Sequence, residues 1–519
     1  MTAPSTSVWT APQRWTLAAT VLGSTMAFLD GSVVNVALSA LQQEFGATLA
    51  AVGWVANAYT LMLAALILVG GALGDLYGRK RMFGLGVGLF ALASLLCGLA
   101  PQLGVLIGAR VLQGIGGALL IPGSLALING VFPRQMRGRA IGLWSAITSM
   151  VLIFGPALGG LLVDTASWRW VFLLNLPLAA LVLLALPRVP ESRDETRRGT
   201  PPDLVGSLLA VAGLGALTSG LITAGERGWN GAALGLTLAG MLGVILFVVW
   251  EARSRSPMLP LSLFRSAGFA GTNLLTFLLY GALGSALFFL PLVLIGALGF
   301  SATAAGSALL PLSLLLAGLS GVFGGLADRI GPRLPLTVGP ILAGIGFALM
   351  ARIGVGAPYW TTILPAMVTL GLGMAITVAP LTTAVMGSVG ASYAGTASGV
   401  NNAVSRAAGL LMLALFTLLT LGSFGRSLET RLAGAALPAA ARQTMLAQSA
   451  QLARVPVPSS LNSAQAAAAQ QAVKLAFVDS FRQVALWSAL LAVLAGLAGC
   501  ISLNPKRGPA LPTDHPDSV

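Results

Sequence analysis

The chain has 519 residues, of which 56% are hydrophobic and only 8% charged, and its mean hydropathy is +0.88. Soluble proteins carry about a quarter of their residues as charged side chains, so this composition excludes an ordinary soluble enzyme or binding domain. The net charge of +14 does not indicate nucleic-acid binding, because the basic residues stand in small clusters between apolar runs of about twenty residues.

Fourteen apolar runs predict membrane-spanning helices, since each is long enough to cross a hydrocarbon core of ~30 Å. An even number of spans returns the two termini to the same side. The expected spans are 15–39, 52–73, 82–100, 104–128, 140–163, 169–187, 204–224, 232–251, 268–292, 303–326, 334–353, 359–386, 396–421 and 482–503.

Basic residues orient these helices in the membrane. Clusters follow every second span, and loops rich in Lys and Arg stay on the cytoplasmic side. We therefore expect a multi-pass protein of the cytoplasmic membrane with both termini cytoplasmic. The clusters are Arg79, Lys80 and Arg81; Arg134, Arg137 and Arg139; Arg188, Arg193, Arg197 and Arg198; Arg253, Arg255 and Arg265; Arg329 and Arg333; and Lys506 and Arg507.

The turn after the second span (71–80) is similar to the turn after the tenth (324–333). Gly, Leu, Asp, Gly and a basic residue match in register, and such self-similarity is typical of transporters built from repeated halves. We therefore predict an N-terminal six-helix half over 15–187, a linker and inserted helix pair over 188–266, and a C-terminal six-helix half over 267–503.

The stretch 422–481 differs from the plain spans. A helix-like run opens at Leu437-Pro438, the segment 455–458 interrupts it with two prolines, and Ser463 starts an Ala/Gln-rich run. We predict an extracytoplasmic helical hairpin of two short helices, packed on each other over the external mouth. The alternative is a disordered tether, which the Gln and Ser content favours.

Asp30 is the only acid deep inside a predicted span, and Arg110 lies at a similar depth in the fourth span. A carboxylate in hydrocarbon is costly, so it faces a cavity or a partner and marks a functional site. Arg110 is its natural partner, although an arginine can also snorkel to the surface. We expect Asp30→Asn to stop transport while stability holds or rises, because a desolvated charge is removed.

Other residues in the spans are candidates for contacts with a substrate or between helices. Arg406 has no acid near it in the sequence and contacts either a ligand or helix-end carbonyls. A Gly-Pro segment in the fifth span allows close helix approach and alone indicates packing. The expected cavity residues are Asn35, Asn57, Gln113, Asn401 and Arg406, and the expected gating or structural residues are Gly71, Asp75, Gly78, Arg79, Gly155, Pro156, Gly159, Gly160 and Asp328.

Several motifs are absent from the sequence. The single histidine, His515, lies in the tail, and the three lysines stand in no phosphate-loop motif. Neither a metal site nor a nucleophile–base pair can be assembled from the pattern. We therefore expect no enzyme activity, no cofactor and no ATP motor, so that an ion gradient drives transport. The remaining class is a membrane sensor or assembly partner, which the intramembrane Asp30 and Arg110 disfavour.

Five motifs resemble those of the major facilitator superfamily, and within it the fourteen-span drug:proton antiporters of the EmrB/QacA type. Each is weak alone, but together they stand in order, in the right spans, along essentially the whole chain. They are Leu29 to Ala37, Gly71 to Arg81, Arg110 to Gly114, Gly155 to Gly160, and Gly399 to Gly409.

This resemblance implies a fold of two six-helix halves plus a central helix pair. It implies a proton-coupled antiporter that exports amphipathic drugs or toxic metabolites across the bacterial cytoplasmic membrane, the alternative being uptake or export of one metabolite. Asp30 and Arg110 would couple the proton, the segment 155–160 would gate, and Asp75 and Arg79 would hold the interface between halves.

The partners expected from the resemblance are a small amphipathic substrate, a proton and the lipid bilayer, with no nucleic acid. In a host with an outer membrane, a periplasmic adaptor is a further expected partner. Some relatives carry acids in the tenth and thirteenth spans that recognise cationic drugs, and this sequence has none there. We therefore expect neutral or monocationic substrates and not dications.

Overall fold

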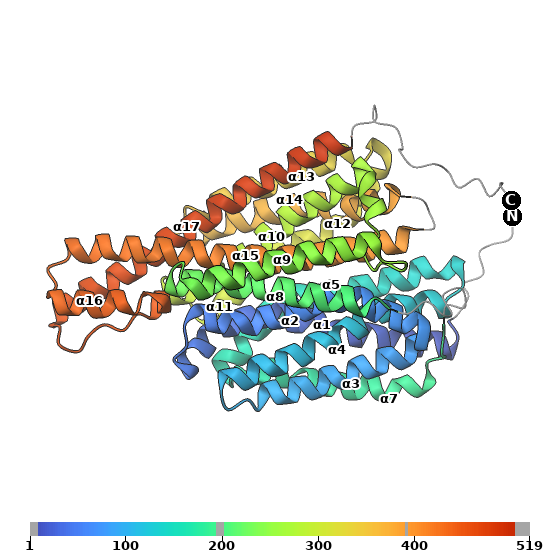
Figure 1. Ribbon diagram of the computed structural model, residues 1–519, viewed down its shortest axis with the longest axis horizontal. Helices are drawn as coiled ribbons and strands as arrows, with labels where there is room; N and C mark the ends of the chain where they lie inside the picture. Colours follow the sequence, from blue (N-terminus) through green and yellow to red (C-terminus); the bar gives the residue numbers. More distant parts are fainter. Residues whose placement is uncertain (1–8, 194–201, 390–392, 504–519) are drawn as a thin grey trace.

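The computed structural model describes residues 9–193, 202–389 and 393–503. Within these ranges the regular secondary structure is helical (Figure 1). Part of the predicted linker (194–201) and the predicted basic pair Lys506 and Arg507 lie outside the described residues. Thirteen helices in the described ranges are long and apolar enough to cross a membrane, which confirms the all-helical membrane fold.

The N-terminal half contains six consecutive helical passes. Long apolar stretches with few helix breakers favour continuous helices, and in a membrane a helix satisfies all its backbone polar groups internally. The fifth pass begins in a basic segment and then runs over residues 140–163 without a charged side chain. The passes are α1 (Ala11–Phe45), α2 (Leu49–Tyr77), α3 (Arg79–Gly98), α4 (Leu103–Val131), α5 (Arg134–Thr165), and α6 (Arg169–Leu173) with α7 (Asn175–Ala185).

An inserted pair and a second set of six passes follow. Polar N-caps start several of these helices: Asp203 accepts a hydrogen bond from Gly206 N, and Ser266 accepts one from Phe269 N. The elements are α8 (Leu204–Arg227), α9 (Gly231–Arg253), α10 (Ala267–Gly296), α11 (Ala302–Ser307) with α12 (Leu310–Ile330), α13 (Arg333–Met350), α14 (Leu364–Gly387), α15 (Ala394–Gly434) and α17 (Ser463–Ser502).

The helices run side by side between two ends of the bundle (Figure 1). The end that carries the α2–α3, α4–α5 and α12–α13 turns, with Arg79, Arg137 and Arg333, is called the basic end. The opposite end is called the hairpin end, because it carries α16 (Ala439–Ala447). The inserted helix α8 packs against α2 of the first half and α15 of the second, and α9 packs on α8. The pair therefore covers one seam between the halves.

The hairpin differs from its prediction. The first predicted short helix is present as α16, but the second is part of α17, and α15 and α17 themselves continue past the apolar runs, over 41 and 40 residues. At 1.5 Å per residue each is ~60 Å long, about twice the hydrocarbon thickness. An ion pair of 2.6 Å between Arg431 and Asp479 and a ring contact between Phe424 and Phe477 hold the extensions together. The prediction of a separate second helix was wrong because falling hydropathy ends a membrane span but not a helix.

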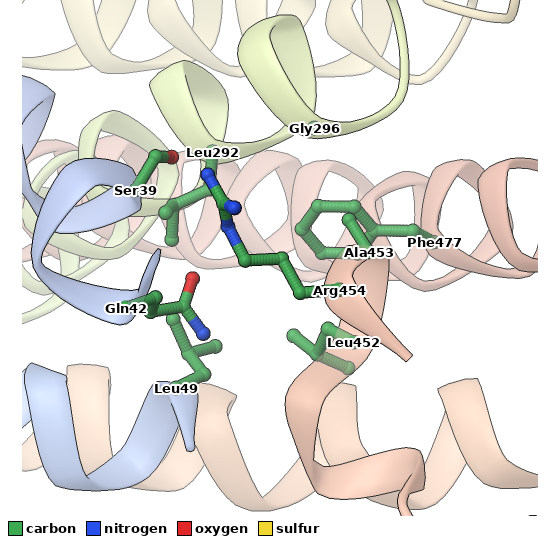
Figure 2. Close-up of a pocket in the computed structure, with 9 residues that line it drawn as sticks. All are labelled: Ser39, Gln42, Leu49, Leu292, Gly296, Leu452, Ala453, Arg454 and Phe477. Carbon is green, nitrogen blue, oxygen red and sulfur yellow. The ribbon is translucent and has the colours of Figure 1, made fainter. Parts of the chain in front are cut away.

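The connection between these extensions returns to the bundle. A 3-10 turn, η6 (Ser449–Arg454), lies against the hairpin ends of α2 and α10. Figure 2 shows Arg454 extended toward Ser39 and Gln42 of α1. Partial burial keeps the pKa of Arg454 below the usual range of an arginine side chain. The hairpin thus contacts both halves at this end.

Candidate functional site

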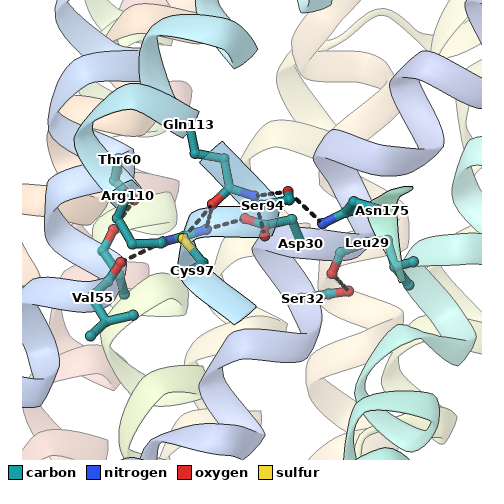
Figure 3. A network of polar contacts seen from close by, with 11 residues as sticks. Leu29, Asp30, Ser32, Val55, Thr60, Ser94, Cys97, Arg110, Gln113 and Asn175 are labelled. Carbon is teal, nitrogen blue, oxygen red and sulfur yellow. Dashed lines mark hydrogen bonds and ion pairs between the residues drawn. The ribbon is translucent and has the colours of Figure 1, made fainter. Parts of the chain in front are cut away.

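A buried ion pair joins α1 to α4 in the centre of the N-terminal half. Arg110 Nη1 donates to Asp30 Oδ2 at 2.5 Å, and the two side chains are 1% and 0% exposed (Figure 3). The sequence placed both residues at a similar depth, and the structure brings them into direct contact. Because a buried charge without a partner is very unfavourable, each of these groups compensates the charge of the other.

Gln113 extends the pair into a polar network. Its amide nitrogen donates to Asp30 Oδ1 and to Ser94 Oγ, both at 2.8 Å, and its carbonyl oxygen accepts from Arg110 Nη1 at 2.6 Å. Asn175 donates to Ser94 Oγ at 3.3 Å, so the network reaches α3 and α7 (Figure 3). Gln113 was expected in the cavity wall, but it is fully buried between helices. Both Asp30 oxygens therefore accept hydrogen bonds.

Arg110 also contacts the side of α2. Its Nε donates to the carbonyl oxygen of Val55 at 2.7 Å, and its guanidinium lies 4.4 Å from the centre of the Tyr59 ring. An aromatic face next to a desolvated cation adds about 2 kcal/mol of attraction. Arg110 therefore keeps two contacts that do not involve Asp30, which matters when the carboxylate is neutralised.

A central cavity lies between the two halves, beside this network. It encloses about 680 Å³ of empty space, counting the part open to solvent. Arg110 forms part of its wall, whereas Asp30 is not among the lining residues. Of the predicted cavity residues, Asn35, Asn57 and Arg406 line it. The others that line it are Gly31, Val34, Ala56, Tyr59, Thr60, Gly284, Phe288, Gly409, Leu410 and Leu413.

Asn401, the remaining predicted cavity residue, lies elsewhere. Its amide nitrogen donates to Thr276 Oγ1 at 2.7 Å and to Asn273 Oδ1 at 3.1 Å, so it joins α15 to α10 within the C-terminal half. In contrast, the sequence argument did not select Tyr59. A single tyrosine in an apolar span carries a polar group into the membrane, and this signal was available in the sequence.

Small residues close the seam between α5 and the C-terminal half at the hairpin end. A Cβ atom on Gly160 would overlap the backbone of Ala302 in α11, and one on Gly306 would overlap the backbone of Pro156 in α5. On the other face of α5, Gly159 packs against Val33 of α1. Only glycine permits backbones to approach this closely, so the segment 155–160 forms a helix contact between the halves.

The same seam is open at the basic end. Ideal Cβ atoms on Gly138 and Gly142 of α5, and on Gly318, Gly321 and Gly325 of α12, would meet nothing within 4 Å. These five glycines thus face empty space, whereas Gly160 and Gly306 near the hairpin end face backbone of the other half. Along this seam, the two halves are in contact at one end of the cavity and apart at the other.

Asp164, near the end of α5, adds a polar contact to the closed side. Its carboxylate accepts hydrogen bonds from Thr303 N at 2.7 Å, Thr303 Oγ1 at 2.6 Å and Ala302 N at 3.1 Å, and so caps α11 of the other half. We expect Asp164→Ala to weaken this closure by about 0.5–2 kcal/mol, as loss of a helix-capping side chain does. Spin labels at Ala166 and Ala304 measure the effect as a larger population of long distances. An unchanged distance distribution would show that Asp164 does not hold the seam.

The repeated turns have different contacts in the two halves. Arg79 pairs with Asp75 of the same half at 2.8 Å, and Glu191 accepts hydrogen bonds from Lys80 N at 2.9 Å and Arg81 N at 3.2 Å. Gly78, with φ of 111°, makes the turn between α2 and α3, as Gly331 does at φ 82° between α12 and α13. Gly71 packs against Pro122 of α4, and Asp328 is exposed. Within the described residues, no group of three His, Cys, Asp or Glu side chains is placed to hold a metal.

Several known proteins are similar to this chain in sequence. The sequence model of the Major Facilitator Superfamily matches residues 20–413. The chain is 39% identical to the "Multidrug resistance protein Stp" of Mycobacterium tuberculosis, over 75% of this chain and 73% of that protein. It is 31% identical to the "Tetracenomycin C resistance and export protein" of Streptomyces glaucescens, over 96% of this chain and 94% of that one.

Among solved structures, the fold is similar to that of a bacterial homologue of the human lysosomal transporter Spinster in an inward-facing, occupied conformation. The TM-score is 0.61 at 17% sequence identity, covering 95% of this chain and 97% of that one. At this identity the likeness concerns the fold alone.

Proposed function

This chain belongs to the major facilitator superfamily, and on that premise we propose that it is a proton-coupled antiporter that exports amphipathic drugs or toxic metabolites from the cytoplasm. It is a multi-pass membrane protein that handles small substrates. The observation that carries the proposal is the fully buried pair of Asp30 and Arg110 at the wall of the central cavity. We further propose that it catalyses no covalent reaction.

Proton coupling follows from the chemistry of this pair. When Asp30 is ionised, Arg110 Nη1 is held 2.5 Å from it. A proton on Asp30 removes the opposite charge, so that Arg110 is left with Val55 O, Gln113 and the rings of Tyr59 and Phe172 as partners. Because Arg110 also lines the cavity, protonation changes the charge and shape of the wall that a substrate contacts. Such a link lets the proton and the substrate affect each other's binding.

Alternating access follows from the two ends of the α5 seam. We assign the hairpin end to the outside and the basic end to the cytoplasm, because loops rich in Lys and Arg remain cytoplasmic. On this assignment, the structure is closed outside and open inside along the seam, ready to receive a cytoplasmic substrate. Export then requires α5 and α11 to part at Gly160 and Asp164 while α5 and α12 come together.

The direction of transport rests on the relatives. One is named for multidrug resistance and another for resistance and export, which supports efflux over uptake. Tetracenomycin C, the compound in the second name, is therefore the first probe. Expression in an efflux-deficient host is expected to raise the inhibitory concentration of tetracenomycin C or of other amphipathic antibiotics in a panel. Increased cellular accumulation with no resistance would favour uptake of a specific metabolite instead.

The orientation of the protein in the membrane can be tested by thiol labelling. Cysteines introduced at Ser449 in η6 and Ser463 at the start of α17 should react with a membrane-impermeant thiol reagent on intact cells. Ser463 is exposed and the native Cys97 is buried, and the half-buried Cys500 at the basic end is replaced by serine to keep background labelling low. A cysteine at Ala252, exposed at the basic end of α9, is the matched control that should react only after the membrane is opened. The reverse pattern would overturn the proposed cytoplasmic termini.

A further inference from the structure

The cavity carries a positive charge without a counter-ion among the described residues. Arg406 of α15 lines it, and its Nε is buried without a hydrogen-bond partner. In the described part of the chain, Arg406 makes no ion pair, and no acidic residue lines the cavity. The second cation of the wall, Arg110, is neutralised by Asp30. The uncompensated charge of the cavity is therefore that of Arg406.

A partly desolvated guanidinium offers five N–H donors and no acceptor. Leaving such donors unpaired is costly, and a ligand that supplies acceptor atoms recovers that cost on binding. A cationic ligand would instead add a second positive charge with no acid in the wall to balance it. The remaining wall includes Phe288, Leu410 and Leu413, which favour an apolar body next to the polar group.

We propose that the cavity selects amphipathic compounds that present acceptor oxygens, as a carbonyl, phenolate or carboxylate, to Arg406, and that it rejects permanent cations. Arg406 is the specificity-determining residue of the site. The role of this selectivity in export rests on the proposed function. The selectivity itself can be measured as binding, which needs no proton gradient. It replaces the expectation of neutral or monocationic substrates with one of neutral or anionic substrates.

Three triphenyl compounds and one tetraphenyl compound test this chemistry on the full chain in lipid nanodiscs. Triphenylacetate carries an anionic acceptor, triphenylphosphine oxide a neutral acceptor and triphenylmethane no acceptor, and tetraphenylphosphonium is a cation. Binding is measured calorimetrically after subtraction of empty nanodiscs. We expect one or both acceptor compounds to bind about tenfold or more tightly than triphenylmethane, with tetraphenylphosphonium the weakest. The two acceptor arms distinguish an anionic from a neutral ligand.

Three variants test whether the preference for acceptor compounds depends on Arg406. Arg406→Gln is expected to lower acceptor affinity by about tenfold to a hundredfold and to improve tetraphenylphosphonium binding. Arg406→Lys keeps the charge and should restore the preference in part. Arg426→Gln, on the same helix but exposed at the hairpin end, should change nothing. Misfolding would weaken all four ligands together, so a gain for the cation separates specificity from structural damage.

Two results would overturn the proposal. One is tetraphenylphosphonium binding to the wild type as tightly as the acceptors do, and the other is Arg406→Gln weakening every ligand alike. Failure of the proposed export function would give a different result. Proton-driven flux would then be absent, while ligand binding would still depend on Arg406.

Discussion

Replacing Asp30 with asparagine is expected to abolish proton-driven export, reducing resistance to that of cells without the protein. The amide keeps the shape of the carboxylate but takes up no proton between about pH 4 and 10, so the coupled group is lost. The measurement is drug resistance in an efflux-deficient host, together with proton release in membrane vesicles. Wild-type flux driven by a pH gradient in this variant would contradict the role of Asp30.

The structure reverses one expectation for this variant. The sequence led us to expect that the free energy of unfolding holds or rises when Asp30 is neutralised. In the structure, however, Arg110 lies 2.5 Å from Asp30 and is 1% exposed. Breaking a buried pair by removing one partner costs about 3–5 kcal/mol, because the other charge stays buried. The double variant Asp30→Asn with Arg110→Gln removes both charges, and should recover thermal stability without recovering transport. Loss of stability in both variants would mean that the network, not the charge, holds the helices.

Replacing Gly160 with alanine is expected to hold the hairpin end of the α5–α11 seam open. The added methyl would overlap the carbonyl group of Ala302, and backbone cannot move aside as a flexible side chain can. Overpacking of this kind costs about 1–3 kcal/mol, a factor of about 5–150 between two conformations. Spin labels at Ala166 and Ala304 should show the long-distance population growing by this factor, with transport falling accordingly.

The matched control is Gly235→Ala in α9, which packs on α8 and takes no part in the seam. Its methyl would meet nothing within 4 Å, so the distance distribution and transport should remain as in the wild type. If both alanines reduced transport equally, the loss would not be specific to the seam. If neither did, the seam would not be the gate.

Much of the architecture was predictable because the bilayer restricts the possible structures so strongly. Apolar runs of about twenty residues require helices, and their order located the passes within a few residues. The depth of Asp30 and Arg110 could be counted along two helices, which is why their contact was expected from the sequence.

Features that depend on side chains from distant elements were not predictable. Glu191 caps the α2–α3 turn from the far end of the N-terminal half, and nothing in its local sequence indicates this contact. Gln113 and Asn401 were expected in the cavity, but a polar residue inside a span satisfies its hydrogen bonds equally well between helices. The extensions of α15 and α17 were missed because hydropathy marks where the membrane ends, and helix propensity continues beyond it.

The direction of proton movement relative to the substrate tests the central claim most directly. Purified protein is reconstituted in liposomes, and transport of the compound that gives the strongest resistance phenotype is followed with and without an imposed pH gradient. We predict that protons and substrate move in opposite directions, that the gradient accelerates transport, and that Asp30→Asn removes this acceleration. Transport at the same rate without a gradient, or protons and substrate moving in the same direction, would contradict the account.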